Sequence, residues 1–146
     1  MSAPARRGQL LDVATQLAVE QGFHAVTVDA IARRAGITRA VIYQHFKDLQ
    51  AMLEEVIQRE TSRAQLQVSQ TTLSDLTHGD PSQLMLESLS AFLHAVQENP
   101  ATWTLVLMPP QGAPESLRQS IADGRNAVLR RMTRAVAPVL ASDQEE

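Results

Sequence analysis

The sequence predicts an all-α fold, because three observations point to helices. Apolar residues recur at intervals of three and four along most of the 146 residues, which is the spacing of one helix face. Capping residues or prolines stand before these periodic stretches, and glycines follow several of them. No stretch alternates apolar and polar residues in the manner of a half-buried strand. We therefore expect helices throughout, joined by turns and one longer loop.

The first predicted helix spans residues 4–21 and buries a single stripe. The stripe consists of Leu10, Leu11, Ala14, Leu17 and Ala18. Gly22 ends the helix, because a glycine accepts the left-handed conformation without a Cβ clash. Phe23 then turns back onto the core.

Two short helices joined by a tight turn come next. Thr27 caps the first, and Asp29 in its first turn is favoured by the helix dipole. Gly36 ends it, and Thr38 caps the second. The inner face of the first helix is Val28, Ile31, Ala32 and Ala35, and the buried side of the second is Val41, Ile42 and His45 or Phe46. This pattern predicts a helix-turn-helix.

A longer fourth helix, capped by Asp48, is expected to link the two halves of the chain over residues 48–70. Its apolar positions are Leu49, Met52, Leu53, Val56 and Ile57. Its outer face holds Glu54, Glu55, Gln58 and Arg59. Residues 71–80 are rich in Ser, Thr, Asp and Gly, which predicts a loop and a domain boundary.

Two further helices are predicted where a capping residue stands directly before proline. Asp80 precedes Pro81 and Asn99 precedes Pro100, so each pair supplies a cap and then a proline at the first helical position. The first of these helices is apolar over much of its circumference, and a Pro-Pro-Gly region after residue 108 ends the second.

The last predicted helix begins at Pro114, and Pro138 should end or kink it. The residues from Ser142 to Glu145 then form a capping-box pattern, the usual start signal of another helix. Two interpretations follow: the chain is truncated where that helix would begin, or it ends in an acidic tail that frays.

Composition excludes several classes of protein. Without cysteine there is no disulfide framework, thiolate metal site or thiol nucleophile. No apolar run approaches the roughly 20 residues of a membrane span, and the N-terminus lacks a secretory signal, so we expect a cytoplasmic protein without membrane contact. Metalloprotease, hydrolase-elbow and phosphate-loop motifs are missing, and the four histidines are dispersed. We therefore expect no enzyme, no metal and no cofactor.

The charge is unevenly distributed along the chain. The net charge is −3, but residues 1–47 carry six basic and three acidic side chains, a balance of +3. The residues from Asp48 onward carry seven basic and thirteen acidic side chains, a balance of −6. A basic N-terminal part followed by an acidic remainder is expected when the first part binds nucleic-acid phosphates and the remainder has a different role.

The stretch from Gly22 to Leu53 resembles the N-terminal domain of the TetR (tetracycline-repressor-like) family of transcription regulators. The likeness is carried, without a gap in the spacing, by Gly22, Phe23, Thr27, Ile31, Ala32, Ala35, Gly36, Ile37, Thr38, Tyr43, His45, Phe46, Lys47 and Leu53. It implies a helix-turn-helix DNA-binding domain at residues 1–47 and a helical ligand-binding and dimerisation domain at residues 48–146. It further implies a homodimer, and a repressor whose binding to double-stranded operator DNA is released by a small-molecule effector. The family usually dimerises through two late helices, for which this chain has no room, so we expect either that a longer protein was cut or that dimerisation uses the helix from Pro114 to Ala137 and its neighbours.

The resemblance also places the helix that begins after Thr38 in the major groove of DNA, where base edges are distinguishable. Arg39 is the candidate for a base contact, because a guanidinium group grips guanine through two acceptors at once. Thr38, Ala40 and Gln44 add hydrogen bonds or a methyl contact. Thr27, Tyr43 and Lys47 hold phosphates, while Arg33 and Arg34 contribute charge. Each has an ordinary alternative: the threonines as caps, Tyr43 as a packing ring, and the paired arginines as a solvated face.

Leu49 departs from the family pattern, which usually has a second lysine at this position. A phosphate clamp is then missing, so binding is weaker or the contact moves to Lys47 and to backbone N–H groups of the fourth helix. Together with the net charge of −3, this leaves a second interpretation open. The chain would then be an all-helical interaction module whose helix-turn-helix no longer binds DNA specifically.

An apolar pocket in the second half would suit a small molecule. The candidate lining residues are Met85, Phe92, His94, Trp103, Leu107, Met108, Arg125 and Met132. For each of them taken alone, an ordinary place in the core is the alternative. Trp103 is the most informative, because a buried indole N–H requires a partner.

Overall fold

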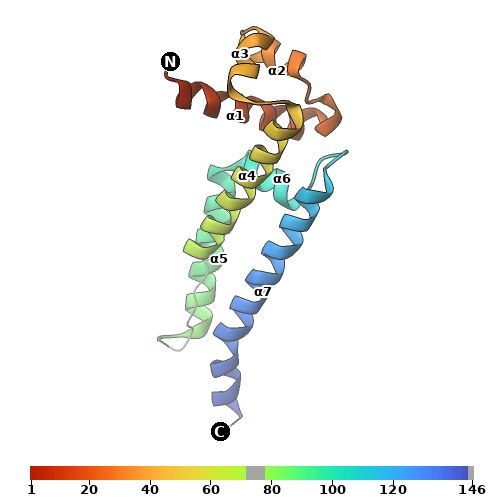
Figure 1. The fold of residues 1–146 in the computed structure, drawn as a ribbon. Helices are drawn as coiled ribbons and strands as arrows, with labels where there is room; N and C mark the ends of the chain where they lie inside the picture. The colour runs from red at the N-terminus through yellow and green to blue at the C-terminus, as the bar shows by residue number, and fades with distance from the viewer. Residues whose placement is uncertain (72–77, 145–146) are drawn as a thin grey trace.

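The computed structural model describes residues 1–71 and 78–144, and within these ranges the chain forms seven α-helices and no strand. The all-α prediction is therefore confirmed. The helices are α1 (Ala3–Gln21), α2 (Val28–Ala35), α3 (Arg39–His45), α4 (Leu49–Thr71), α5 (Pro81–Glu98), α6 (Pro100–Leu107) and α7 (Glu115–Asp143), with a 3₁₀ turn η1 (Phe23–Ala25) after α1. Figure 1 shows α1, α2 and α3 as a small head, from which α5 and α7 extend away. No helix in the described ranges is long and apolar enough to cross a membrane.

One apolar cluster holds the head together and continues beneath it. Leu10 of α1, Ile31 of α2, Ile42 of α3 and Met52 of α4 are each at most 1% exposed. Leu105 of α6 and Leu117 of α7, both at 0% exposure, belong to the same cluster. The helix-turn-helix therefore rests on a core to which α6 and α7 also contribute. Burial of this kind, more than local propensity, stabilises helices as short as α2 and α3.

Two glycines shape the head through positive φ angles. Gly22 ends α1 at a φ of 92°, and its N–H donates to the Ala18 carbonyl. Gly36 ends α2 in the left-handed conformation, with φ 68° and ψ 35°, and sets the tight turn into α3. Both predicted helix ends are confirmed.

Replacing Gly36 with alanine is expected to lower the free energy of unfolding by about 1 kcal/mol, because an L-residue with a Cβ resists the left-handed conformation. The cost comes from the backbone alone, since no neighbouring atom lies within 4 Å of a Cβ at this position. The matched control is Gly8→Ala inside α1, which has equally open surroundings and an expected gain of about 0.5–1 kcal/mol. Urea unfolding of both variants checks the prediction, and equal shifts in the same direction would contradict it.

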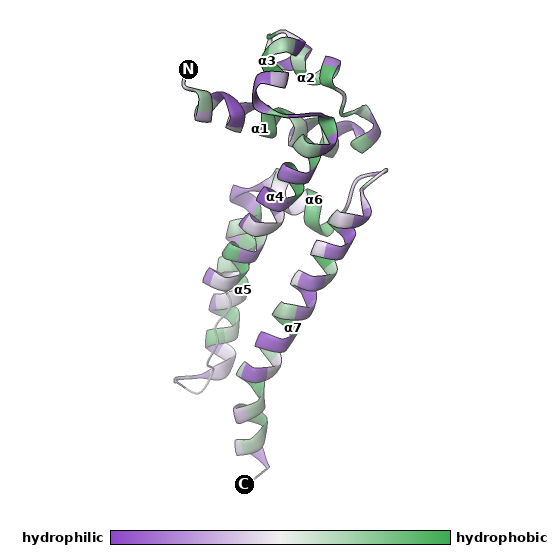
Figure 2. Ribbon diagram, viewed as in Figure 1, coloured by the Kyte–Doolittle hydropathy of each residue, from purple (hydrophilic) through white to green (hydrophobic). Residues whose placement is uncertain are grey.

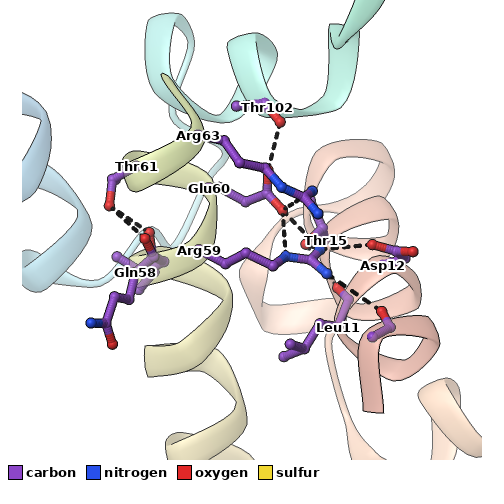
Figure 3. Close-up of polar contacts among 11 residues, drawn as sticks. Leu11, Asp12, Thr15, Gln58, Arg59, Glu60, Thr61, Arg63 and Thr102 are labelled. Carbon is purple, nitrogen blue, oxygen red and sulfur yellow. Dashed lines mark hydrogen bonds and ion pairs between the residues drawn. The ribbon is translucent and has the colours of Figure 1, made fainter. Parts of the chain in front are cut away.

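Below the head, α4 carries a buried cluster of polar side chains. The spacing of the apolar residues in α4 did not predict this cluster. Figure 3 shows the carboxylate of Glu60, which is 1% exposed, between Arg59, Arg63 and Thr102. The Thr102 hydroxyl of α6 donates to Glu60 Oε2 at 2.5 Å, and Arg59 Nε donates to Glu60 Oε1 at 2.9 Å. Arg59 also pairs with Asp12 of α1 at 2.8 Å. The predicted outer position of Arg59 is therefore wrong: its side chain, 19% exposed, lies against α1.

The lower parts of α5 and α7 bury little apolar surface within the described chain. No residue of α5 is buried, although Figure 2 shows hydrophobic segments along it. Leu86, Leu89 and Leu93 of α5 are each more than half exposed, as is Leu129 of α7. The spacing of the α5 residues predicted a helix with a wide apolar face, and the helix is confirmed, while residues 1–71 and 78–144 leave much of that face exposed.

The side-chain caps predicted at helix N-termini are present at some positions and absent at others. Asp48 accepts from the Ala51 N–H at 2.8 Å, and Asp80 accepts from the Ser82 N–H at 3.1 Å, which confirms both caps. Asn99 precedes α6 as expected, but its side-chain amide donates to the Ala95 carbonyl and makes no capping bond.

The prediction that Pro138 could end the last helix is also wrong. The helix α7 continues through Pro138 to Asp143. Ser142 lies inside this helix and donates to the Pro138 carbonyl, so it does not cap a new one. Proline leaves the carbonyl four residues before it without a donor but does not prevent the next turn from forming. Glu145 and most of the predicted loop at residues 71–80 lie outside the described residues.

Candidate nucleic-acid interface

The nine residues predicted to meet DNA are all exposed on the head. They are Thr27, Arg33, Arg34, Thr38, Arg39, Ala40, Tyr43, Gln44 and Lys47. Within α3, residues 39, 40, 43 and 44 share one face because they are spaced by three and four. On the opposite side Ile42 is buried, and Phe46 directly after the helix is 4% exposed. The core thus fixes which face of α3 points to solvent.

Arg39 stands in a small polar group at the start of α3. Its Nε lies 3.4 Å from Asp29 Oδ1 of α2. A hydrogen bond with Tyr43, and then the charge of Asp29, raise the pKa of Arg39 above its already high usual value. The guanidinium is therefore charged at any working pH and is oriented along the exposed face. Both partners of the Asp29 pair are more than half exposed, so DNA can displace this contact at little cost.

The remaining basic residues of the helix-turn-helix divide into a paired and an unpaired group. Arg34 Nη1 lies 2.8 Å from Glu20 Oε2 of α1. Hydrogen bonds from Gln16 and then Arg34 lower the pKa of Glu20. By contrast, no ion pair joins Arg33 or Lys47 to an acidic group elsewhere in residues 1–71 and 78–144. Arg33 and Lys47 are thus the more available for phosphate.

The two threonines behave differently from one another. Thr27 Oγ1 accepts from the Ala30 N–H at 3.1 Å, so Thr27 is a helix cap while its residue remains exposed. Thr38 is the N-cap residue of α3, as predicted, but its side chain makes no capping bond. Its uncommitted hydroxyl group stays next to Arg39 on the exposed side.

Leu49 is fixed by packing, because it is half-buried and lies against the core cluster of the head. The position of the missing lysine is therefore apolar in its surroundings as well as in its sequence. Asp48 already occupies one N–H of the first turn of α4. Lys47 and the other backbone N–H groups of this turn stay the predicted replacements for the phosphate contact.

Sequence reasoning missed Arg7, which it counted only as a basic residue of the head. Arg7 donates to the carbonyl oxygen of His45 and pairs with Glu55 of α4. Its guanidinium carbon lies 4.2 Å from the centre of the Phe46 ring. These partners are 38 to 48 residues away in sequence, so no local pattern reports them.

The predicted pocket residues are for the most part not brought together. Phe92 and Trp103 meet edge to face, with 5.0 Å between ring centres, and the Trp103 indole N–H donates to Gln67 at 2.6 Å. Trp103 is 4% exposed and Phe92 is half-buried, so the two rings pack together partly out of solvent. Leu107, Met108 and Met132 are between 45% and 68% exposed. Met85, His94 and Arg125 are likewise exposed on α5 and α7.

Two surface hollows in the described part of the chain are each lined by a single helix, so neither gathers these candidates. Residues 87–97 of α5 line one hollow, and residues 127–134 of α7 line the other. His94 is the only pocket candidate among the residues lining the first, and none lines the second. The ligand pocket stays a prediction.

Comparison with known proteins gives this geometry a context. Residues 10–56 match the family of bacterial regulatory proteins described as the tetR family. The activator FasR of Mycolicibacterium smegmatis is 33% identical over 101 residues, which cover 69% of this chain and 45% of that protein. The regulator BetI of Klebsiella pneumoniae is 40% identical over 60 residues, covering 41% and 31% of the two chains. The chain spans about half the length of the curated relatives it matches.

The fold has a solved counterpart in a TetR-like transcriptional regulator from a Rhodococcus species. The TM-score is 0.66 at 22% identity, and the match covers 99% of this chain and 74% of that one. The fatty acid degradation regulator FadR of Bacillus halodurans has the same fold, with a TM-score of 0.58 at 20% identity and coverage of 99% and 71%. The class defined by fold and site is that of helix-turn-helix regulators. Within that class, residues 10–56 carry the N-terminal segment of the tetR family, and 101 residues of the chain are similar to a regulator of this class.

Proposed function

We propose that the chain is a transcription regulator that binds double-stranded operator DNA through the exposed face of α3. The observation that carries the proposal is the division of this short helix into two faces. Arg39, Ala40 and Gln44 are exposed, whereas Ile42 is anchored in the core. An α-helix with such a face fits the major groove, whose base edges carry a distinct pattern for each pair.

The proposal gives each group a role. Arg39 exchanges its Asp29 partner for the two acceptors of a guanine, which is a favourable exchange because the Asp29 pair is exposed. Thr38, Ala40 and Gln44 make the adjoining base contacts. Thr27, Tyr43 and Lys47 face the backbone phosphates, with charge from Arg33 and Arg34. Phosphate contacts fix position, and base contacts specify sequence.

The assignment of the rest of the chain is part of the same proposal. Residues 1–47 form the DNA-binding domain, and residues 48–146 form a helical regulatory domain that serves a homodimer and a small-molecule effector. We propose that effector binding releases the operator, as in a repressor located in the cytoplasm without membrane contact. The similar proteins include both activators and repressors: FasR is named an activator, and KstR2 of Rhodococcus jostii is named a repressor. We propose no catalysis.

The test is a titration of labelled duplexes with the protein at several salt concentrations. One duplex comes from the region upstream of the protein's own gene, and the other is unrelated in sequence. Specific binding with a steep, linear dependence of log K on log salt supports a regulator, because phosphate contacts release counterions. Equal and negligible binding to both duplexes supports instead an interaction module that has lost DNA recognition.

Two substitutions distinguish a residue that contacts bases from a residue that contacts phosphates. Arg39→Ala is expected to cost roughly 1–3 kcal/mol of binding free energy and to relax the preference at one base position, whereas Lys47→Ala is expected to weaken all sequences alike. Competition titrations against single-base variants of the bound duplex measure both effects. If Arg39→Ala leaves affinity and preference intact, the guanidinium does not read a base.

A further inference from the structure

The helix α3, which we propose to bind in the major groove, is too short to be stable as a helix on its own. It has only seven residues, and isolated helices below about 12–15 residues are marginal in water. Its first residue lacks a side-chain cap, because the Thr38 hydroxyl makes no capping bond. Its last backbone hydrogen bond runs from the Phe46 N–H to the Ile42 carbonyl at 3.0 Å. The carbonyl groups at its C-terminal end therefore depend on partners from elsewhere in the fold.

Arg7 of α1 supplies a hydrogen-bond donor to one of these carbonyl groups. One guanidinium nitrogen donates to the carbonyl of His45, the last residue of α3, and another pairs with Glu55 of α4. The guanidinium carbon lies 4.2 Å from the centre of the Phe46 ring. A cation at the C-terminal end of a helix is also favoured by the helix dipole. Three elements meet on this single side chain.

We propose that Arg7 is a positioning residue for DNA recognition: it fixes the C-terminal end of α3 against α1 and α4, and does not itself contact phosphate. This inference rests on the proposed DNA binding. A planar guanidinium with several donors makes the carbonyl bond, the carboxylate pair and the ring contact together, which a lysine ammonium cannot do. Because both donating nitrogens already have partners, Arg7 adds little to the phosphate-binding charge of the head.

The chain supplies a matched control in the neighbouring residue. Arg6 carries the same charge on the same helix, but its side chain donates to Gln9 of α1 at 2.8 Å. Arg6→Ala and Arg7→Ala therefore change the net charge equally, while only the second releases α3. Glu55→Gln weakens the same arrangement from the α4 side and serves if Arg7→Ala fails to fold.

The first readout is DNA binding by the full chain, with the upstream duplex and the unrelated duplex as probes. Relative to Arg6→Ala, Arg7→Ala is expected to lose about tenfold in affinity for the upstream duplex, with the unrelated duplex and the salt slope unchanged. Arg7→Lys and Glu55→Gln should show smaller losses in the same direction. Equal losses for Arg6→Ala and Arg7→Ala on both duplexes, with equally shallower salt slopes, would overturn the proposal, since that is the behaviour of phosphate contacts.

The second readout needs no DNA. Amide hydrogen exchange of the free protein is expected to become faster at Tyr43 to Phe46 in Arg7→Ala and to stay unchanged there in Arg6→Ala. Unchanged exchange in both variants would overturn the positioning role. If the wild type fails to prefer the upstream duplex, the proposed function fails, while the exchange rates still decide whether Arg7 holds α3.

Discussion

Glu60→Ala is expected to lower the free energy of unfolding by about 3 kcal/mol. Removing one partner of a buried, hydrogen-bonded ion pair is strongly destabilising because the remaining charge stays buried and unpaired. Here the substitution deprives Arg59, which is 19% exposed, and the buried hydroxyl of Thr102 of their shared acceptor. We place the cost at the lower end of the usual range because Arg59 keeps Asp12. Chemical denaturation of the purified variant measures it.

The control for this prediction is Glu54→Ala on the same helix, where the exposed carboxylate should contribute less than about 0.5 kcal/mol. Glu60→Gln retains an acceptor for Thr102 and should fall between the two. A Glu60→Ala variant as stable as Glu54→Ala would show that the cluster contributes nothing to holding the head on α6.

Ile42→Ala is expected to cost about 2–5 kcal/mol, because it removes a side chain that is 1% exposed and leaves a cavity between α3 and the core. Ile42→Val, which removes one methylene group, should cost about 0.5–1.5 kcal/mol. Thermal and denaturant unfolding of the series report the graded loss. Leu89→Ala on α5 is the control, because a side chain that is 54% exposed should change stability by less than about 0.5 kcal/mol. Equal effects at positions 42 and 89 would contradict the assignment of the core.

Local signals explain what the sequence predicted correctly. Thr27, Asp48 and Asp80 cap helices through bonds to residues two or three positions away, and Gly22 and Gly36 end helices through their own backbone angles. The exposed face of α3 follows from the spacing of its few apolar residues. Information of this kind lies within one or two turns of the chain, so a single sequence reveals it.

Contacts between distant segments explain what the sequence did not predict. Glu60 was no candidate because a glutamate at the edge of an apolar pattern predicts solvent, and its burial depends on Thr102, 42 residues later. Arg59 was placed outside for the same reason, and Arg7 was only counted as a basic residue, although the partners of both lie on other helices. The predicted pocket stays a prediction, because apolar spacing identifies a helix face and not the element that covers it.

The most direct test of DNA binding through α3 uses the absence of cysteine from the chain. A cysteine introduced at Ala40, in the exposed first turn of α3, carries a photo-cross-linker as the only modified site, and one introduced at Leu89 of α5 serves as comparison. The account predicts cross-linking to the bases of the upstream duplex from position 40 and none from position 89. Cross-linking from position 89 with none from position 40 would show that DNA, if bound, lies on another surface.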